Sequence, residues 1–210
     1  HNKDALKSIN KHAIHYYKDL LNTADAESLM RINGSLLVFE SSSIEEVKKH
    51  YEHYKNEDIA VELLDREQIT ALEPNLSDKV NYALYFTQVA HTIDPYDVCQ
   101  AIAQYAIKLG AKFNKASVVD ITETEEQVIL SFENTQTNSK SDNFVKQSYD
   151  HIVVATGAWS KSLLNSLGYS LPLEVERGYS LNLQKKDKAE LTRPVASAER
   201  KFIMTPMAHG

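Results

Sequence analysis

The stretch Ile152-Val153-Val154-Ala155-Thr156-Gly157-Ala158-Trp159-Ser160 decides the expected fold of this chain. Its first four residues are all apolar and predict a strand buried on both faces, as in a doubly wound α/β sheet. Gly157 follows at the carboxyl end of that strand, where open α/β folds bind ligands. A helix over 160–167 is expected next, closed by Gly168. A tight strand-to-helix turn also needs a small residue for steric reasons alone, so ligand binding and simple packing both stay open for this motif.

A helix and three strands are predicted around this stretch. Asp94 can cap a helix and Pro95 fits its first turn, so a helix is expected from there to Leu109, with Gly110 in a left-handed cap. Strands are expected at 117–121, 128–132 and 148–155, with an exposed polar loop at 134–143.

The first ninety residues alternate between helix and strand patterns. They predict an opening amphipathic helix, a hairpin over 30–39 around Asn33-Gly34, a helix starting at Ser43, a strand at 61–64, a helix opened by Asp65 and a strand at 82–89. This order suggests helices on one face of an antiparallel or mixed sheet. Two further strands are expected at 175–183 and 202–204.

Composition limits the class of protein. The 210 residues carry a net charge of -6, which argues against nucleic acid as a main partner, because phosphate binding needs a concentrated basic face. The single cysteine, Cys99, points to a reducing compartment and thus to the cytoplasm. No apolar run approaches the roughly 20 residues of a membrane-spanning helix. The chain starts at His1 rather than methionine, so we expect that it lacks its native start.

Several motifs occur in an order that resembles a known family. They are His91-Thr92-Ile93-Asp94-Pro95-Tyr96, Leu109-Gly110-Ala111, Val118-Val119, the Ala155 to Ser160 turn and Arg177-Gly178-Tyr179-Ser180-Leu181. Together they resemble the FAD-dependent D-amino-acid oxidase/dehydrogenase family, and the last motif is most similar to the D-amino-acid dehydrogenases. The resemblance covers roughly residues 30–210.

The resemblance implies an α/β (α+β) fold made of pieces of two domains. These are part of a Rossmann-like FAD-binding domain and a substrate domain with a mixed or antiparallel sheet covered by helices. Residues 1–91 would hold the first helix and the first substrate-domain part, 92–168 would belong to the FAD-binding domain, and 169–210 would return to the substrate domain.

The resemblance also assigns candidate site residues. The cofactor would lie along Val118, Val119, Ala155, Thr156, Gly157 and Trp159. Arg177, Gly178, Tyr179, Phe202 and Met204 would lie near the flavin or the substrate. No catalytic residue is assignable, and none of Arg31, Arg66, Arg193 and Arg200 matches the family's carboxylate-binding arginine.

The implied activity belongs to a longer parent enzyme. The parent would oxidise the CH-NH2 group of a D-amino acid or related small amine to an imine, and then a 2-oxo acid, by hydride transfer to FAD. The chain has no G-x-G-x-x-G turn for the pyrophosphate, so by itself it is expected to be inactive and to bind FAD weakly or not at all. A stand-alone substrate-binding or interaction module is the alternative. Peripheral attachment of the parent to the inner membrane stays open, as does its oligomeric state.

Three other signals have structural interpretations. His12 with His15, and His50 with His53, are spaced as helical neighbours, but no third metal ligand is apparent, so solvated helix faces are favoured and no metal is expected. Cys99 is expected in the core. His91 is expected to have a structural role between domains.

Overall fold

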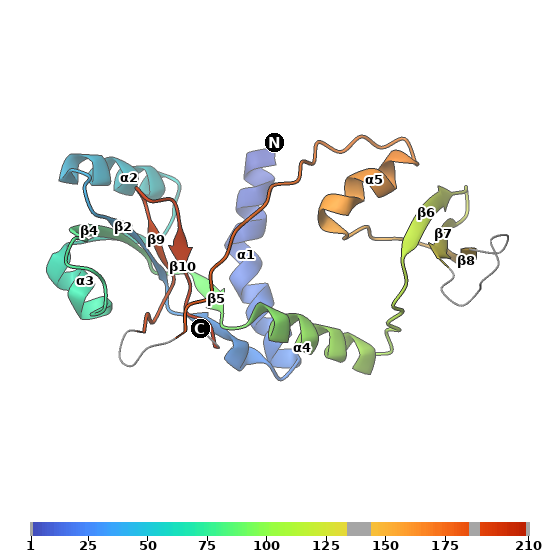
Figure 1. Ribbon diagram of the computed structural model, residues 1–210, viewed down its shortest axis with the longest axis horizontal. Coiled ribbons are helices and arrows are strands. Elements are labelled where there is room, and N and C mark those ends of the chain that lie inside the picture. Colours follow the sequence, from blue (N-terminus) through green and yellow to red (C-terminus); the bar gives the residue numbers. More distant parts are fainter. Residues whose placement is uncertain (1, 134–143, 185–189, 209–210) are drawn as a thin grey trace. The chain divides into compact units, whose positions relative to one another are not determined.

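The computed structural model describes residues 2–133, 144–184 and 190–208. Its contacts divide the chain into two compact units, His1–Ala111 with Leu181–Gly210, and Lys112–Ser180. Both units combine helices with strands, in agreement with the predicted α/β class (Figure 1). The assignment of 1–91, 92–168 and 169–210 to substrate and cofactor domains stays a prediction.

A five-stranded sheet forms the centre of the first unit. Its order is β10-β9-β2-β4-β3, with β2 at Ser35–Phe39, β3 at Val61–Leu64, β4 at Tyr82–Phe86, β9 at Val195–Ser197 and β10 at Ile203–Met204. The pair β2–β9 is parallel and the other pairs are antiparallel, so the sheet is mixed, as predicted. The parallel pair joins segments far apart in the sequence.

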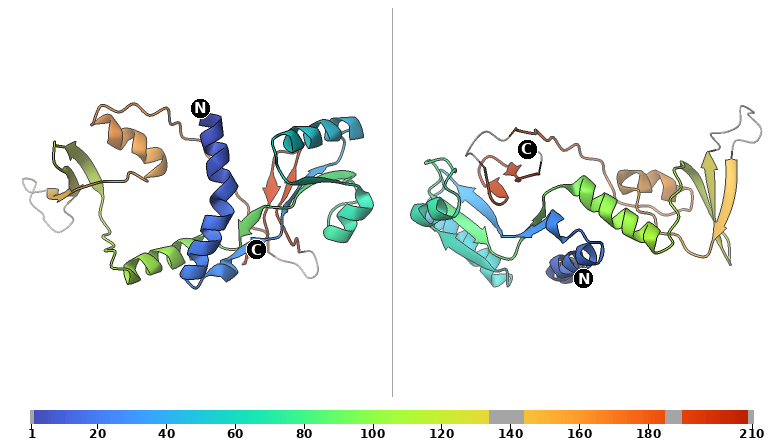
Figure 2. Two further views of the ribbon diagram at one scale, coloured as in Figure 1. Left: turned by 180° about the vertical axis from the view of Figure 1, so that it is seen from behind. Right: turned by 90° about the horizontal axis from the view of Figure 1, so that it is seen from below.

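Helices α2 (Ile44–Asn56) and α3 (Arg66–Leu72) cover opposite faces of this sheet (Figures 1 and 2). Phe39 packs in one cluster with Val47 of α2, whereas Val38 packs in another cluster with Ile69 of α3. Successive strand residues point to opposite faces, so the two helices lie on different sides. The prediction that the helices share one face was wrong, since alternation along β2 leaves two apolar faces to bury.

The predicted helix starts are confirmed. The Ser43 side chain accepts from the backbone N–H of Glu46, whose carboxylate accepts from the Ser43 N–H, and Asp65 with Gln68 makes the same capping box for α3. Asp94 accepts from two backbone N–H groups at the start of α4 (Pro95–Lys108), and Gly110 has a φ of +100°. These starts depend on neighbours two or three residues away, which the sequence displays directly.

The predicted hairpin over 30–39 was wrong. Strand β1 (Met30–Ile32) pairs with β5 (Ala90–Thr92), and β2 pairs with β4 and β9 in another sheet. Gly34 does have a φ of +78°, but it lies against Tyr85, and a Cβ there would sit 2.4 Å from that ring. The glycine therefore permits the close approach of the Tyr85 ring to the backbone before β2 rather than a chain reversal.

Helix α1 (Asn2–Thr23) ends against α4. Leu21 and Ala26 form a buried cluster with Val98 of α4, and the short helix η1 (Glu27–Leu29) connects α1 to β1. No helix among the described residues has both the length and the apolar composition needed to span a membrane.

The second unit contains a three-stranded antiparallel sheet of β6 (Val118–Glu123), β7 (Val128–Glu133) and β8 (Phe144–Tyr149). A short helix η2 (Gly157–Trp159) leads into α5 (Ser160–Asn165), and α5 lies beside β6. The predicted loop at 134–143 falls outside the described residues.

Two predicted strands are absent from the described part of this chain. Residues 152–155 and 175–183 are irregular, and Val153 is 89% exposed. An apolar segment becomes a strand buried on both faces only when it pairs into a sheet whose two faces are covered, and no described strand pairs with either segment. The predictions at 152–155 and 175–183 were therefore wrong for this chain.

A buried ion pair fastens β9 to the rest of the first unit. The Glu73 carboxylate is fully buried and accepts from Arg193 Nε at 3.0 Å, from the Thr192 backbone N–H and from the Thr192 hydroxyl. Arg193 also donates to the Asn33 carbonyl at 2.6 Å and to the Tyr85 hydroxyl at 3.1 Å. The pair thus joins α3, β4 and the approach to β9.

Removal of one partner of this pair should strongly destabilise the first unit. Glu73→Ala would leave the Arg193 guanidinium and the Thr192 N–H without their acceptor, and the expected loss is about 3–5 kcal/mol of unfolding free energy. Urea unfolding followed by circular dichroism measures it. Glu62→Ala, at an exposed position on β3, is the control and should change stability by less than about 0.5 kcal/mol. Equal losses in the two variants would contradict the role of the pair.

Candidate functional site

The turn at Gly157 is open to solvent. Gly157 has a φ of +56°, and no atom lies within 4 Å of the position that a Cβ would take. Ala155 and Thr156 are exposed, and Trp159 is 77% exposed. The Thr156 and Ser160 hydroxyls lie 2.9 Å apart and hold the turn at the start of α5. The backbone here can be approached by another molecule.

Strand β6 brings the other predicted cofactor residues into the same unit. Val118 is half-buried and Val119 is 44% exposed. The register of β6 against β7 shifts between Val118 and Asp120, so Val119 has no partner residue in the ladder. A bulge of this kind re-aims a side chain at the edge of a sheet. The predicted cofactor residues all lie within Lys112–Ser180 and so belong to this one unit, in which α5 lies beside β6.

The residues predicted near the flavin and the substrate are divided between the two units. Arg177, Gly178 and Tyr179 belong to the second unit, where they are exposed and irregular. Phe202 and Met204 belong to the first unit.

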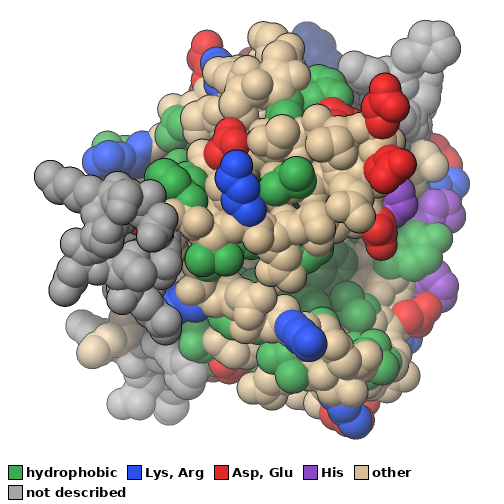
Figure 3. Space-filling model, turned by 90° about the vertical axis from the view of Figure 1, so that its right-hand side faces the viewer, with side chains coloured by type: hydrophobic (Ala, Val, Ile, Leu, Met, Phe, Trp, Pro, Cys, Tyr) green, Lys and Arg blue, Asp and Glu red, His purple; other side chains and the backbone are tan. Residues whose placement is uncertain are grey.

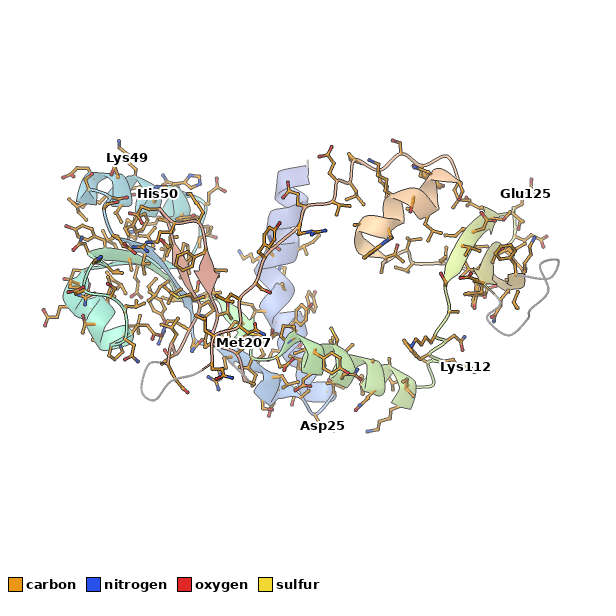
Figure 4. All side chains as sticks on the ribbon, viewed as in Figure 1. Asp25, Lys49, His50, Lys112, Glu125 and Met207 are labelled. Atoms are coloured by element: carbon orange, nitrogen blue, oxygen red, sulfur yellow. The ribbon has the colours of Figure 1, made fainter. Side chains whose placement is uncertain are left out.

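Phe202 and Met204 line a hollow of about 860 Å³ in the first unit. The hollow lies on the face of the sheet that α3 covers, because Val38 and Val80 line it and belong to the cluster that contains Ile69 of α3. Met207, labelled in Figure 4, lies on the segment after β10 and also lines it. Helix α3 packs mainly on β3 and β4, and the hollow lies beside it along β9 and β10.

Two of the charged residues that line the hollow, Glu40 and Arg200, pair with each other, and Glu199 beside Arg200 has partners of its own. Arg200 Nη2 lies 2.5 Å from Glu40 Oε2. Glu199 Oε1 accepts from the backbone N–H groups of Glu40, Ser41 and Ser42 and from the Ser42 hydroxyl, at 3.0–3.3 Å. Partial burial raises the pKa of Glu199, but these hydrogen bonds together outweigh it and leave the pKa below its usual value.

On the face drawn in Figure 3, lysine and arginine side chains lie scattered among acidic and apolar ones. The described residues seen there form no single basic patch.

The family model described as FAD dependent oxidoreductase (DAO) matches residues 1–210. The chain belongs to this family. Among curated proteins it is 25% identical over 199 residues to the D-amino-acid oxidase of Bradyrhizobium diazoefficiens, covering 95% of this chain and 45% of that protein. It is 29% identical to the D-amino acid dehydrogenase of Rhizobium rhizogenes, covering 76% of this chain and 37% of that protein. This DAO-family chain thus spans less than half the length of these relatives.

Solved structures of DAO-type flavoenzymes share the fold. Glycine oxidase from Bacillus cereus superimposes with a TM-score of 0.70 at 18% identity, covering 97% of this chain and 54% of that one. L-proline dehydrogenase from P. horikoshii gives a TM-score of 0.68 at 17% identity, covering 93% and 52%. At these identities the likeness shows the fold alone.

Sequence reasoning missed the buried polar residues of this DAO-family chain. Glu73 looks like the last residue of a helix before Pro74. Arg193 was compared only with the family's arginine for the substrate carboxylate, and no local pattern predicts its ion pair with Glu73. Glu199 carries no motif at all, since its partners are backbone N–H groups some 157 residues or more away in sequence. The one local signal in this region is Arg193-Pro194 before a short apolar run. Nothing in that signal indicates which acidic residue pairs with Arg193.

Three minor predictions have different outcomes. Cys99 is exposed on α4, so its predicted place in the core was wrong, because α4 turns Val98, Ala101 and Ile102 into the cluster with Leu21 of α1 and leaves Cys99 outside it. Within the described residues no group of three or more His, Cys, Asp or Glu is arranged to hold a metal, and His50, labelled in Figure 4, packs near Phe39. Burial and then Arg31 lower the pKa of His91, whose ring nitrogens have no partner. Its structural role stays a prediction.

Glu199 should stabilise the first unit in a pH-dependent manner. Its pKa is lowered on folding, so its contribution is present above the usual value of 4.5 and is lost as pH falls through the folded-state pKa. Glu199→Gln should cost about 1 kcal/mol at neutral pH, and the difference should shrink in acid. Urea midpoints at pH 7 and pH 3 measure it.

Glu199→Asp is the matched variant, since it keeps the charge but shortens the reach to the three N–H groups. It should lose nearly as much stability as the glutamine variant at neutral pH. If both variants were as stable at pH 7 as the unsubstituted chain, the stabilising contribution of the Glu199 carboxylate would be contradicted.

Proposed function

We propose that the full-length protein containing this chain oxidises the CH-NH2 group of a D-amino acid or a related small amine. Membership of the FAD-dependent DAO family carries this proposal. The names of the relatives, D-amino-acid oxidase and D-amino acid dehydrogenase, support an amino acid as substrate. The product would be an imine, which water hydrolyses to a 2-oxo acid and ammonia.

The residues of the second unit fit contact with one side of FAD. The open space at Gly157 would let the nucleotide approach the backbone, and the exposed Trp159 ring could cover it. Val118, Val119, Ala155 and Thr156 would complete this contact. Bound FAD would supply the electron acceptor for the hydride that leaves Cα. The protein would orient the substrate and exclude water, which accounts for much of such catalysis.

Substrate contacts would come from Arg177, Gly178, Tyr179, Phe202 and Met204. Phe202 and Met204 have the stronger support, since both line the hollow of the first unit. A neutral amine is needed at Cα before hydride leaves, because the nitrogen lone pair forms the new C=N bond and the nitrogen then loses a proton.

Gly157→Ala in the full-length protein tests the cofactor contact. A methyl group at this turn would meet the approaching nucleotide, so the dissociation constant for FAD should rise about tenfold or more. Flavin absorbance after purification and titration of the apoprotein measure it. Gly168→Ala is the matched control, because Gly168 also has a positive φ, +80°, with open space around it. Its FAD affinity should stay within about twofold.

Equal effects of the two substitutions would mean that only backbone strain matters at Gly157. A colourless full-length protein that binds no FAD on titration would contradict the redox proposal and favour a binding module without redox activity.

The 210-residue chain alone should bind FAD more weakly than micromolar. Its sequence holds no glycine-rich turn at a helix start to bind the pyrophosphate, which supplies much of the affinity for dinucleotides. Isothermal titration of the purified chain with FAD measures this. Micromolar or tighter binding would contradict the expectation.

A further inference from the structure

The turn between β9 and β10 is fastened by hydrogen bonds along its length. The Ala198 N–H donates to the Val38 carbonyl at 3.0 Å, and the Lys201 N–H donates to the Ser197 carbonyl at 3.1 Å. The Ser197 hydroxyl accepts from the Arg200 N–H at 3.2 Å. Lys201 has a φ of +57°, a conformation that a residue with a side chain keeps only where its surroundings impose it. The turn is therefore held in one conformation.

Glu199 ties this turn to the segment between β2 and α2. Its Oε1 atom accepts from the backbone N–H groups of Glu40, Ser41 and Ser42 and from the Ser42 hydroxyl, at 3.0–3.3 Å. Hydrogen bonds to a charged acceptor are stronger than those to a neutral one, so a carboxylate suits this group of donors. The neighbouring Arg200 reaches the same segment through Glu40. One oxygen atom thus joins two segments that are about 160 residues apart.

Phe202 is the first residue after the turn and depends on it. The Ser197 N–H donates to the Phe202 carbonyl at 2.9 Å and closes the hairpin. Strand β10 has only two residues and pairs, among the described strands, with β9 alone. The Phe202 side chain lines the hollow and is 45% exposed, so its own packing restrains it little. The place of Phe202 is therefore set mainly by the turn before it.

We infer that Glu199 is a positioning residue for the reaction, and that it acts by fixing Phe202 beside the substrate. The inference rests on the proposed function and deepens it, because it adds a residue that touches neither substrate nor flavin. Orientation accounts for a large part of catalysis, and a displacement of about 1 Å can cost a hundredfold in rate. A residue that served stability alone would act in the same way whatever side chain stood at position 202.

A double-mutant cycle in the full-length holoenzyme tests this. The substrate is the fastest of D-alanine, D-methionine and D-phenylalanine, and each rate is divided by the amount of bound flavin, so that unfolded protein does not count. Glu199→Gln and Phe202→Ala should each lower kcat/KM about tenfold. The double variant should stay within about twofold of Phe202→Ala, because the contribution of Glu199 is made through the ring that this variant lacks.

Binding gives a measurement apart from turnover. 2-Methylalanine has no hydrogen on Cα and cannot be oxidised, so isothermal titration yields its dissociation constant. Glu199→Gln should weaken its binding by about threefold or less while kcat falls about tenfold, since misorientation of Phe202 acts mainly after binding. Both Glu199 and Phe202 are exposed, so their variants should fold.

Two further variants sharpen the test. Ser42→Ala removes one of the four donors to the Glu199 carboxylate, so it should lower kcat/KM by about threefold, and only while Phe202 is present. Glu62→Gln is the matched control, because it makes the same chemical change at an exposed position on β3 of the same sheet. It should leave kcat/KM within about twofold of the unsubstituted enzyme.

Three results would overturn the inference and leave the proposed function intact. They are a Glu199→Gln enzyme as active per flavin as the unsubstituted one, a Phe202→Ala enzyme that is equally active, and a double variant in which the two losses multiply. A full-length protein that holds FAD and oxidises none of the three amino acids would instead overturn the proposed function and the inference together.

Discussion

The first unit depends on a single buried carboxylate. Glu73 is fully buried and meets the Arg193 guanidinium and two donors of Thr192, although these residues are 119 and 120 positions away in sequence. A carboxylate leaves water at a high cost, which only several hydrogen bonds and an opposite charge can offset. The pair therefore constrains where the returning chain can lie. In that position β9 pairs in parallel with β2, which pairs antiparallel with β4 on its other side.

That constraint explains how the hollow arises. Once Arg193 is held, Val195 lies beside Leu36 and packs into the cluster of α3, and the chain continues through β9 into β10. The sheet is thus extended by two strands, while α3 has only two turns and covers the strands nearest to it. Apolar side chains on β10 and beside it remain uncovered. An extended sheet under a short helix thus leaves a concave apolar surface, which residues of the connecting segments, among them Leu76, Leu191 and Met207, also line.

The sequence predicted best what depends on near neighbours. Ser43 with Glu46, Asp65 with Gln68 and Asp94 before Pro95 all start helices where the residues indicate, because a cap is satisfied within one turn. Family membership was likewise predictable, since the order of several motifs is itself in the sequence. The mixed sheet followed from the alternation of helix and strand patterns.

The predictions that were wrong depend on contacts with residues that are distant in sequence. The hairpin at 30–39 was inferred from Asn33-Gly34, but Gly34 instead allows Tyr85 to approach, a contact that no local pattern can show. The run at 152–155 is apolar enough for a doubly buried strand, yet pairing must come from other strands. Glu73 and Arg193 look like surface residues until their meeting removes both from water.

The two groups of proposed site residues differ in how firmly they are held. Phe202 and Met204 lie beside a strand pair that a buried ion pair fastens, so their positions are set by the core of their own unit. Val118 and Gly157 belong to a small sheet and a turn whose surroundings are exposed. The two groups therefore lie in different surroundings. Strands β9 and β10 follow directly after the buried Glu73–Arg193 pair, which constrains where they can add to the sheet, whereas the turn at Gly157 is open to solvent and no buried pair holds it among the described residues.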